Sequence, residues 1–214
     1  SPLLFLTFRD LYGISYSLLG LLVLLNFCTQ LTVDLIFSFF SHKFNIAKTV
    51  KITPLLTVAG LTVFAMSPFI FGGAVYVGLV IGTVLFSASS GLSEVLLSPV
   101  IAALPAKDPD REMSKLHSIY AWGVMFMVIV STVFLKLFGN ENWQWLALFY
   151  TLIPLSSIVL FSRAEIPPME TPEKVSGAVK MLKNKTLWLY VGAIFLGGAA
   201  ECTMSQWSSG YLEQ

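Results

Sequence analysis

Charged side chains are scarce in this sequence. Only 12% of its 214 residues are Asp, Glu, Lys or Arg, whereas roughly a quarter of the residues in an ordinary soluble domain are charged. Hydrophobic residues make up 56% of the chain, which is more apolar surface than a water-soluble fold of this size can hide. Composition therefore predicts an integral membrane protein. The formal net charge of +1 also excludes a strong overall field that would attract nucleic acid.

Cysteine and histidine are rare as well, with two residues of each. Cys28 and Cys202 lie in apolar runs, so we expect small packing residues rather than a disulfide framework. No set of side chains has the spacing of a metal site, of a nucleophile with its base, or of a phosphate-binding loop. The sequence accordingly predicts no catalysis, no metal and no cofactor.

What the sequence does contain is a series of apolar runs separated by short polar breaks. A spanning α-helix needs about 20 mostly apolar residues. We expect the tail of one helix at 2–8, followed by helices at about 15–40, 52–66, 69–103, 116–138, 143–161 and 187–207. Ser67-Pro68 is expected to end the third helix, and Trp143 and Trp145 to anchor the sixth at the membrane interface. These runs predict an all-α membrane protein.

The basic residues fall almost entirely on one side of this arrangement. The links after the second, fourth and sixth helices hold 11 of the 13 Lys and Arg residues, and only Arg9 and Lys136 lie on the other side. Because cytoplasmic loops are enriched in Lys and Arg, these three links are predicted to be cytoplasmic.

The order of the runs also predicts a domain plan. The chain opens inside an apolar stretch without an initiator Met and stops just past another such stretch, so we expect a fragment of a longer protein. The plan is a transmembrane bundle at 1–162 with a truncated first helix, a cytoplasmic linker at 163–186, and the truncated first helix of a second bundle at 187–214. Such a layout is expected of membrane transporters built as two six-helix halves.

Three carboxylates interrupt the apolar helices: Asp34, Glu94 and Glu201. A charge at the bilayer centre costs at least about 2.5–3.5 kcal/mol, so such residues normally face a polar cavity or a partner. Glu94 ends the small and polar stretch 87–94, where helices can approach closely and a cavity can open. A carboxyl held away from water favours its neutral form and could exchange a proton; the alternative is a carboxylate that serves packing alone.

Asn26, Gln30 and Asp34 are spaced four residues apart and therefore share one helical face. A polar stripe on a membrane helix points away from lipid. It either lines a cavity that hydrogen-bonds a polar solute or only holds helices together. Asp34, near the predicted cytoplasmic end of its helix, could instead tether the following loop to a neighbouring helix.

Two further residues are candidates for solute or proton binding. Glu201 follows a run of small residues, 197–200, near the predicted outer end of the last helix, where it is either part of an exterior gate or a solvated interfacial carboxylate. His117 opens the fifth helix beside Tyr120 and Trp122. Histidine titrates near neutral pH and suits proton transfer, but a purely interfacial residue is the alternative.

The order of helices, the basic link after the second and the linker after the sixth resemble the major facilitator superfamily. That superfamily has a Gly-x-x-x-Asp-Arg-x-Gly-Arg-Arg-like signature between its second and third helices. Here Asp34 stands where Gly is usual, Ser38 replaces the acid and Ser41 the second Gly, and a second register places His42-Lys43 at the Asp-Arg positions. The resemblance implies a major facilitator-type helical bundle, made of an N-terminal six-helix half and the first helix of a second half.

Within that superfamily, the segment 93–100 followed by Leu104-Pro105 is similar to the fourth helix of fucose permease-like sugar:proton symporters. In that branch a helix-four Glu precedes an Asn-Pro and is associated with the substrate cavity and with proton coupling. The resemblance gives this role to Glu94, whereas Ser98 stands where the branch has Asn.

The resemblance thus implies a multi-pass transporter of the cytoplasmic membrane. It would move a small polar solute, a sugar, together with protons by alternating access, with the Asn26 face binding hydroxyls and the full-length chain working as a monomer. Its partners would be the solute, protons and the lipid bilayer, and no nucleic acid. The alternatives are an exporter of drugs or metabolites with the same fold, and a membrane sensor or assembly subunit that transports nothing.

Overall fold

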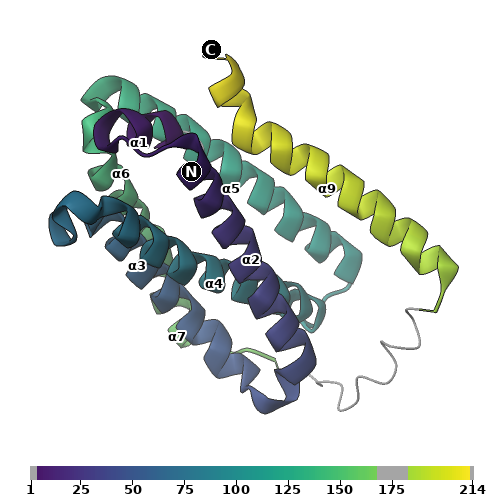
Figure 1. Ribbon diagram of the computed structural model, residues 1–214. Coiled ribbons are helices and arrows are strands. Elements are labelled where there is room, and N and C mark those ends of the chain that lie inside the picture. Colours follow the sequence, from purple (N-terminus) through teal and green to yellow (C-terminus); the bar gives the residue numbers. More distant parts are fainter. Residues whose placement is uncertain (1–3, 168–182, 213–214) are drawn as a thin grey trace.

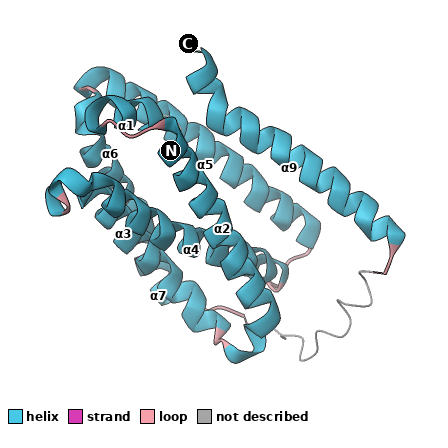
Figure 2. Cartoon of the chain, viewed as in Figure 1, coloured by secondary structure: helices cyan, strands magenta, loops and turns pink. Residues whose placement is uncertain are grey.

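The computed structural model describes residues 4–167 and 183–212, and every regular element among them is helical (Figures 1 and 2). The predicted all-α fold class is confirmed. The helices are α1 (Phe5–Tyr12), α2 (Tyr16–Phe40), α3 (Ile46–Ile70), α4 (Val75–Ala102), α5 (Pro109–Phe138), α6 (Trp143–Tyr150), α7 (Leu152–Arg163) and α9 (Lys185–Leu212), with short 3₁₀ turns η2 (Ser41–Lys43), η3 (Gly72–Ala74) and η4 (Asn140–Asn142).

Six stretches of the described chain are long and apolar enough to cross a membrane. They are α2, α3, α4, α5, the α6–α7 pair and α9, in agreement with six of the predicted runs. The eight-residue α1 overlaps the predicted run at 2–8 and extends it to Tyr12. Most of the predicted linker at 163–186 lies outside the described residues.

Side-chain caps fix where several helices start. Ser15 accepts a hydrogen bond from the backbone of Leu18 and so begins α2 at the predicted position. Asp108 does the same for the N–H of Arg111, and Pro109 occupies the first helical position. The charged stretch after α4 therefore forms the first two turns of α5, which begins well before the expected position 116.

The third helix does not end at Ser67-Pro68 as expected. α3 continues through Pro68 to Ile70, and the chain reverses only at Gly72, whose φ of +50° suits a residue without a Cβ. Fully buried Ser67 donates to the carbonyl of Phe64 within this last part of α3. The Ser67 hydroxyl thus bonds to the carbonyl that Pro68, which has no N–H, leaves without its helical partner, and α3 continues past Pro68.

The predicted sixth helix is interrupted at Thr151, between α6 and α7. Pro154 has no N–H to offer to the carbonyl of Tyr150, so one hydrogen bond of a continuous helix is missing here. Thr151 keeps helical backbone angles, and its hydroxyl donates to the carbonyl of Leu148 at 2.6 Å. The two helices therefore form one kinked membrane span.

One hydrophobic cluster joins α1, α2, α3, α4 and α6. Trp143 lies fully buried within it, in edge-to-face contact with Phe8 (centroids 4.9 Å apart) and Phe64 (5.7 Å). Its indole N–H donates to the hydroxyl of Tyr12 at 3.1 Å. The expectation that Trp143 anchors the helix in the lipid interface is therefore wrong, while Trp145 is exposed.

A second cluster marks the basic end of the bundle, where α2, α4 and α7 finish and α3 and α5 start. Phe37 of α2, Val50 of α3 and Leu96 of α4 form its buried centre, and Phe161 of α7 and Ile166 pack against it. The ends of α2, α4 and α7 therefore lie together, which is the shared side that the distribution of Lys and Arg predicts for the three links (Figure 1).

α3 and α4 cross with almost no side chain between their backbones. A Cβ atom built on Gly82 would lie 2.6 Å from the Cβ of Phe64 and 2.8 Å from the carbonyl oxygen of Gly60. One built on Gly60 would lie 2.5 Å from the backbone nitrogen of Phe86. Only glycine fits at these two positions, and small residues are what allow membrane helices to pack this closely.

Hydroxyl groups reinforce the same crossing. The buried Ser89 of α4 donates to the carbonyl of Thr53 in α3 at 2.7 Å. Because this bond uses the single hydrogen of Ser89, Thr57 is the donor in the 2.6 Å bond between its own hydroxyl and Ser89 Oγ. α3 and α4 thus form the rigid centre of the bundle.

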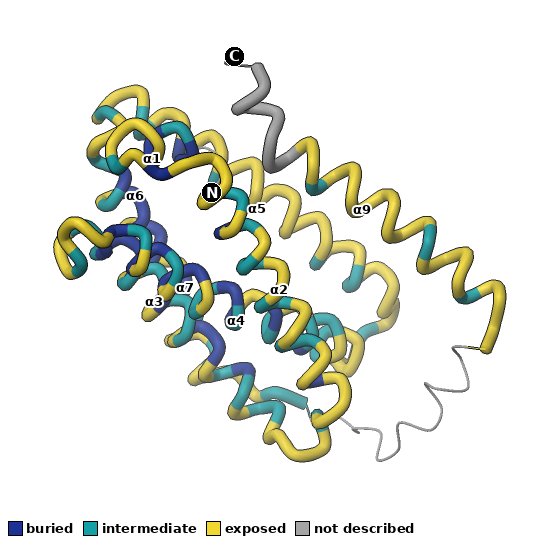
Figure 3. Tube along the Cα trace, in the orientation of Figure 1, coloured by how far each residue is buried: buried dark blue, intermediate teal, exposed yellow. Residues whose placement is uncertain are grey.

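Much of the apolar surface points outward, as a lipid-facing surface does. α5 and α9 are exposed along most of their described length (Figure 3). The single buried side chain of α5, Ser131, donates to the hydroxyl of Tyr150 in α6, which in turn donates to the carbonyl of Met127. Cys28 in α2 is also exposed, so it is not the packing residue expected from the sequence.

The α3–α4 crossing predicts opposite effects for two glycine substitutions. Gly82→Ala should lower the thermal unfolding midpoint, because overpacking against backbone atoms costs about 1–3 kcal/mol. The control is Gly123→Ala in α5, where an added Cβ meets nothing within 4 Å and alanine favours the helix by up to about 1 kcal/mol. Unfolding in detergent measures both, and equal midpoints for the two variants would contradict the crossing.

Candidate functional site

α2 and α4 run parallel and in a fixed register along a polar seam. The hydroxyl of Ser87 in α4, fully buried, donates to the side-chain oxygen of Asn26 in α2 at 2.6 Å. One turn further on, Gly91 lies against the backbone of Gln30. Gly91 follows Gln30 by 61 positions in the sequence, just as Ser87 follows Asn26, so the two helices keep the same register. We call the residues Asn26, Gln30 and Asp34 of α2, with Ser87, Gly91 and Glu94 of α4, the α2–α4 seam.

The sequence of α4 creates two faces that serve different neighbours. Ser87, Gly91 and Glu94 are spaced four and three residues apart and share the face toward α2. Gly82 and Ser89, seven residues apart, share the face that contacts α3. α4 therefore carries its tightest packing on the side of α3 and presents Ser87, Gly91 and Glu94 on the side of α2.

Gly91 brings the two helices together beside Asp34. A Cβ on Gly91 would lie 3.0 Å from the carbonyl oxygen of Gln30 and 3.2 Å from Oδ1 of Asp34. Asp34 Oδ1 is buried and accepts no hydrogen bond from any described residue. The carboxylates of Asp34 and Glu94 lie close enough to interact electrostatically, although Glu94 is itself exposed.

Other polar groups of the seam also keep unused hydrogen-bonding capacity. Asn26 uses its oxygen for Ser87, but its amide nitrogen donates to none of the described residues. The side chains of Gln30 and Glu94 form no hydrogen bond within residues 4–167 and 183–204. Because lipid offers no hydrogen bonds, such groups need water, a solute, an ion or another helix as partner.

The other predicted site residues lie elsewhere. His117 is exposed near the start of α5, and Glu201 is exposed on α9. Within the described parts of the chain, no hydrogen bond or ion pair joins either residue to the α2–α4 seam. The structure thus gathers Asn26, Gln30, Asp34 and Glu94 and leaves His117 and Glu201 outside the group.

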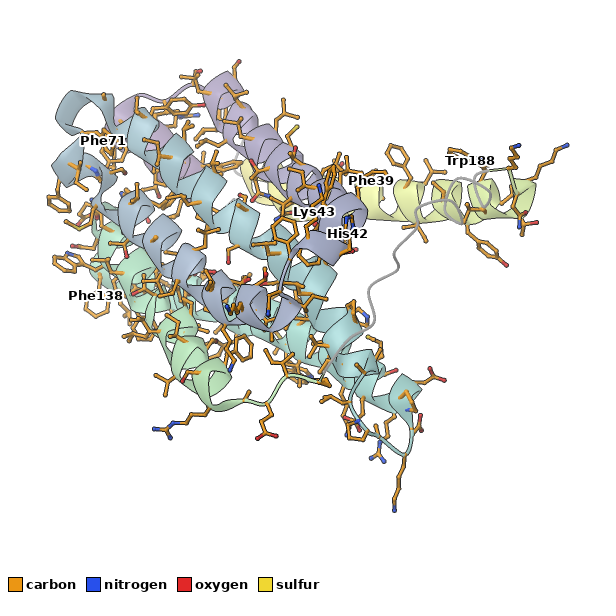
Figure 4. The ribbon with its side chains drawn as sticks, turned by 90° about the horizontal axis from the view of Figure 1, so that it is seen from below. Phe39, His42, Lys43, Phe71, Phe138 and Trp188 are labelled. Atoms are coloured by element: carbon orange, nitrogen blue, oxygen red, sulfur yellow. The ribbon has the colours of Figure 1, made fainter. Side chains whose placement is uncertain are left out.

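The segment compared with the family signature lies at the end of α2. Ser38 belongs to the last turns of α2, and Ser41 to Lys43 form the turn η2. His42 and Lys43 are exposed here, with the ammonium of Lys43 5.1 Å from the ring centroid of Phe40 (Figure 4). Neither of the two registers is tested by this placement, so both stay predictions.

Sequence reasoning missed that some of the polar residues in 87–94 are used up in packing. Ser87 and Ser89 are both fully buried, one against α2 and one against α3. The spacing of Ser87, Gly91 and Glu94 could have indicated a common face. Which neighbour that face meets depends on the fold and has no signal in the sequence.

The family comparison decides the wider identity of the chain. The model of the Major Facilitator Superfamily matches residues 1–214. The chain belongs to the Major Facilitator Superfamily. No curated protein and no solved structure gives a significant match. The predicted superfamily is confirmed, and this Major Facilitator Superfamily member is a multi-pass membrane transporter; the fucose permease-like branch remains a prediction.

The hydrogen bond across the seam predicts a measurable coupling between two substitutions. In a double-mutant cycle of Asn26→Ala and Ser87→Ala, we expect a coupling free energy of about 0.6 kcal/mol and not more than about 1.7 kcal/mol. Unfolding of this superfamily member in mixed micelles measures it. In the control cycle, Asn26→Ala is combined with Ser118→Ala instead of Ser87→Ala. The hydroxyl of Ser118 bonds only to the carbonyl of Ser114 in its own helix. An equal coupling free energy in the two cycles would contradict the register of α2 and α4 that the Asn26–Ser87 hydrogen bond sets.

Proposed function

We propose that this Major Facilitator Superfamily protein is a secondary active transporter that carries a small polar solute, a sugar, in symport with protons. One observation carries the proposal: the α2–α4 seam holds amide and carboxylate groups whose hydrogen-bonding capacity the described bundle leaves unused. Polar residues placed within membrane helices are costly unless they have a partner. A transported solute is the partner that gives all of them a use.

The chemistry of the free groups favours a solute rich in hydroxyls. Asn26 and Gln30 offer N–H donors, and Asp34 and Glu94 offer carboxylate acceptors along the same seam. A hydroxyl both donates and accepts, so a sugar can bond to both kinds of group. The amide faces would bind the hydroxyls, with Asp34 at the end of the row nearest the basic links.

The carboxylates favour coupling to protons. Among the described residues, no Lys, Arg or His forms an ion pair with Asp34 or Glu94. Two neighbouring negative charges in a bilayer repel each other, and the protonation of one removes that cost. Glu94 would take up a proton together with the solute and release it on the other side.

The proposed setting is the cytoplasmic membrane, with the basic end of the bundle facing the cytoplasm. The helices up to α7 would form one half of the transporter, and α9 would begin the second half after a cytoplasmic linker. The seam would then be exposed to each side in turn as the halves rock against each other. The exposure of Glu94 on this half-bundle supports a position at the interface of the halves.

An exporter of drugs or metabolites is the second candidate. The observation in its favour is the Asn26–Ser87 hydrogen bond, which uses part of the polar seam for helix packing. An exporter would expel an amphipathic dye from cells against its gradient and leave sugar uptake unchanged. No described contact favours a sensor or assembly subunit, and most of the linker that such a partner would bind lies outside the described residues.

Sugar uptake by the full-length protein in proteoliposomes tests the proposal. An inward proton gradient should drive the accumulation of a radiolabelled sugar from a panel of hexoses and pentoses. Glu94→Gln should lower the initial rate by roughly tenfold to a hundredfold, the effect of losing a hydrogen bond to a charged group of about 1.5–3 kcal/mol. The remaining uptake should no longer respond to the gradient.

Glu141→Gln is the matched control for this substitution. Glu141 is an exposed carboxylate in η4, away from the seam, so its neutralisation should leave the rate and its gradient dependence intact. The proposed role of Glu94 fails if Glu94→Gln transports sugar as fast as the control with the same dependence on the proton gradient.

A further inference from the structure

Two serines of α4 are equally buried but bond to different kinds of group. Ser87 and Ser89 are both fully buried. Ser89 donates to the backbone carbonyl of Thr53 in α3. Ser87 donates instead to a side chain, the carboxamide oxygen of Asn26 in α2, at 2.6 Å. Ser87 therefore acts on a side chain of the α2–α4 seam, whereas Ser89 only joins two helices.

The hydrogen bond from Ser87 fixes which way round the carboxamide of Asn26 lies. A carboxamide carries an acceptor oxygen on one side and an NH2 group with two donor hydrogens on the other. Because the oxygen faces Ser87, the NH2 group points away from it, and within the described residues it donates to no group. The reverse orientation would take from Ser87 the acceptor that its single hydroxyl hydrogen has here. Asn26 therefore offers donors only.

Gln30, one turn further along the same face of α2, lacks such a restraint. Its side chain forms no hydrogen bond with any residue that the structure describes. Its carboxamide can therefore turn either its oxygen or its NH2 group toward a partner, and it suits a donor and an acceptor equally. Of the two amides, Asn26 is the one that can discriminate between solute groups, because a group held in one orientation leaves a wrong partner unpaired.

Backbone contacts on both sides of Asn26 also hold α2 and α4 together. The hydroxyl of Tyr76 in α4 donates to the carbonyl of Leu18, two turns before Asn26, at 2.9 Å. Gly91 packs against the backbone of Gln30, one turn after Asn26. Loss of the Ser87 hydroxyl should therefore free the carboxamide of Asn26 to rotate without separating the two helices.

We propose that Ser87 is a positioning residue for solute recognition. It holds the carboxamide of Asn26 with the NH2 group toward the solute, so that Asn26 selects a solute oxygen that accepts a hydrogen bond. This role rests on the proposed function, because it needs a solute in the α2–α4 seam. Ser87 is fully buried and acts through the half-buried Asn26. A binding group that is already held in place loses less freedom when the solute binds.

Uptake kinetics of the full-length protein in proteoliposomes test this role, with radiolabelled D-glucose, D-galactose and D-xylose as probes. Ser87→Ala should raise the KM of the transported sugar by about threefold to tenfold, the effect of one hydrogen bond, and leave the maximal rate unchanged. In an Asn26→Leu background the same substitution should leave KM unchanged, because Ser87 acts through Asn26. Ser89→Ala is the matched control and should keep the KM of its parent in both backgrounds.

Infrared spectroscopy measures the orientation of the carboxamide without any transport. In protein made with asparagine that carries an isotope label at its side-chain carbonyl, the difference between wild type and Asn26→Leu isolates the carbonyl band of Asn26. A hydroxyl that donates to this oxygen weakens the C=O bond. Ser87→Ala should therefore shift the band to higher frequency, and Ser89→Ala should leave it in place. An unshifted band in Ser87→Ala overturns the proposal, whatever the protein transports.

The two measurements separate the role of Ser87 from the proposed function. The role is wrong if Ser87→Ala keeps the wild-type KM, if Ser89→Ala raises KM as much, or if Ser87→Ala raises KM in the Asn26→Leu background as well. If the band shifts but none of the probe sugars is taken up, the proposed function fails and the solute role of Ser87 fails with it, whereas the orientation of Asn26 stands.

Discussion

The close approach of α4 to its two neighbours is the constraint on which the rest of the structure depends. On one side, Gly60 and Gly82 let the backbones of α3 and α4 come together, and hydroxyls of both helices satisfy each other there. On the other side, Ser87 and Gly91 fix α4 against α2. In a bilayer, where apolar burial gives helices little reason to associate, such packing and hydrogen bonding must hold the bundle together.

The same constraint explains why polar groups remain free. Ser87 satisfies the oxygen of Asn26 and thereby sets the register of the seam, while Gly91 leaves room for Asp34 instead of filling the space with a side chain. Packing therefore takes up the hydrogen-bonding capacity of some groups in the α2–α4 seam and leaves that of the others free. A transporter of this superfamily needs both properties, because its site must be held in place and still be able to bind and release a solute.

Helical periodicity and charge distribution were enough to predict the spans, the shared face of Asn26, Gln30 and Asp34, and the common side of the basic links. Helical periodicity depends only on residues close in sequence, and the charge distribution is summed over whole segments. The burial of Trp143 could not be predicted, because it depends on Phe8 and Phe64 from other helices. The partner of Ser87 is hidden from the sequence for the same reason.

We propose that the free face of the α2–α4 seam lines a path open to water, and cysteine accessibility tests this most directly. With Cys28 and Cys202 replaced by serine, Gln30→Cys in the full-length protein should react with a membrane-impermeant thiol reagent. Leu31→Cys should not react, although Leu31 is 58% exposed on the bundle, because lipid would cover it. Labelling of Leu31→Cys but not of Gln30→Cys would contradict the account.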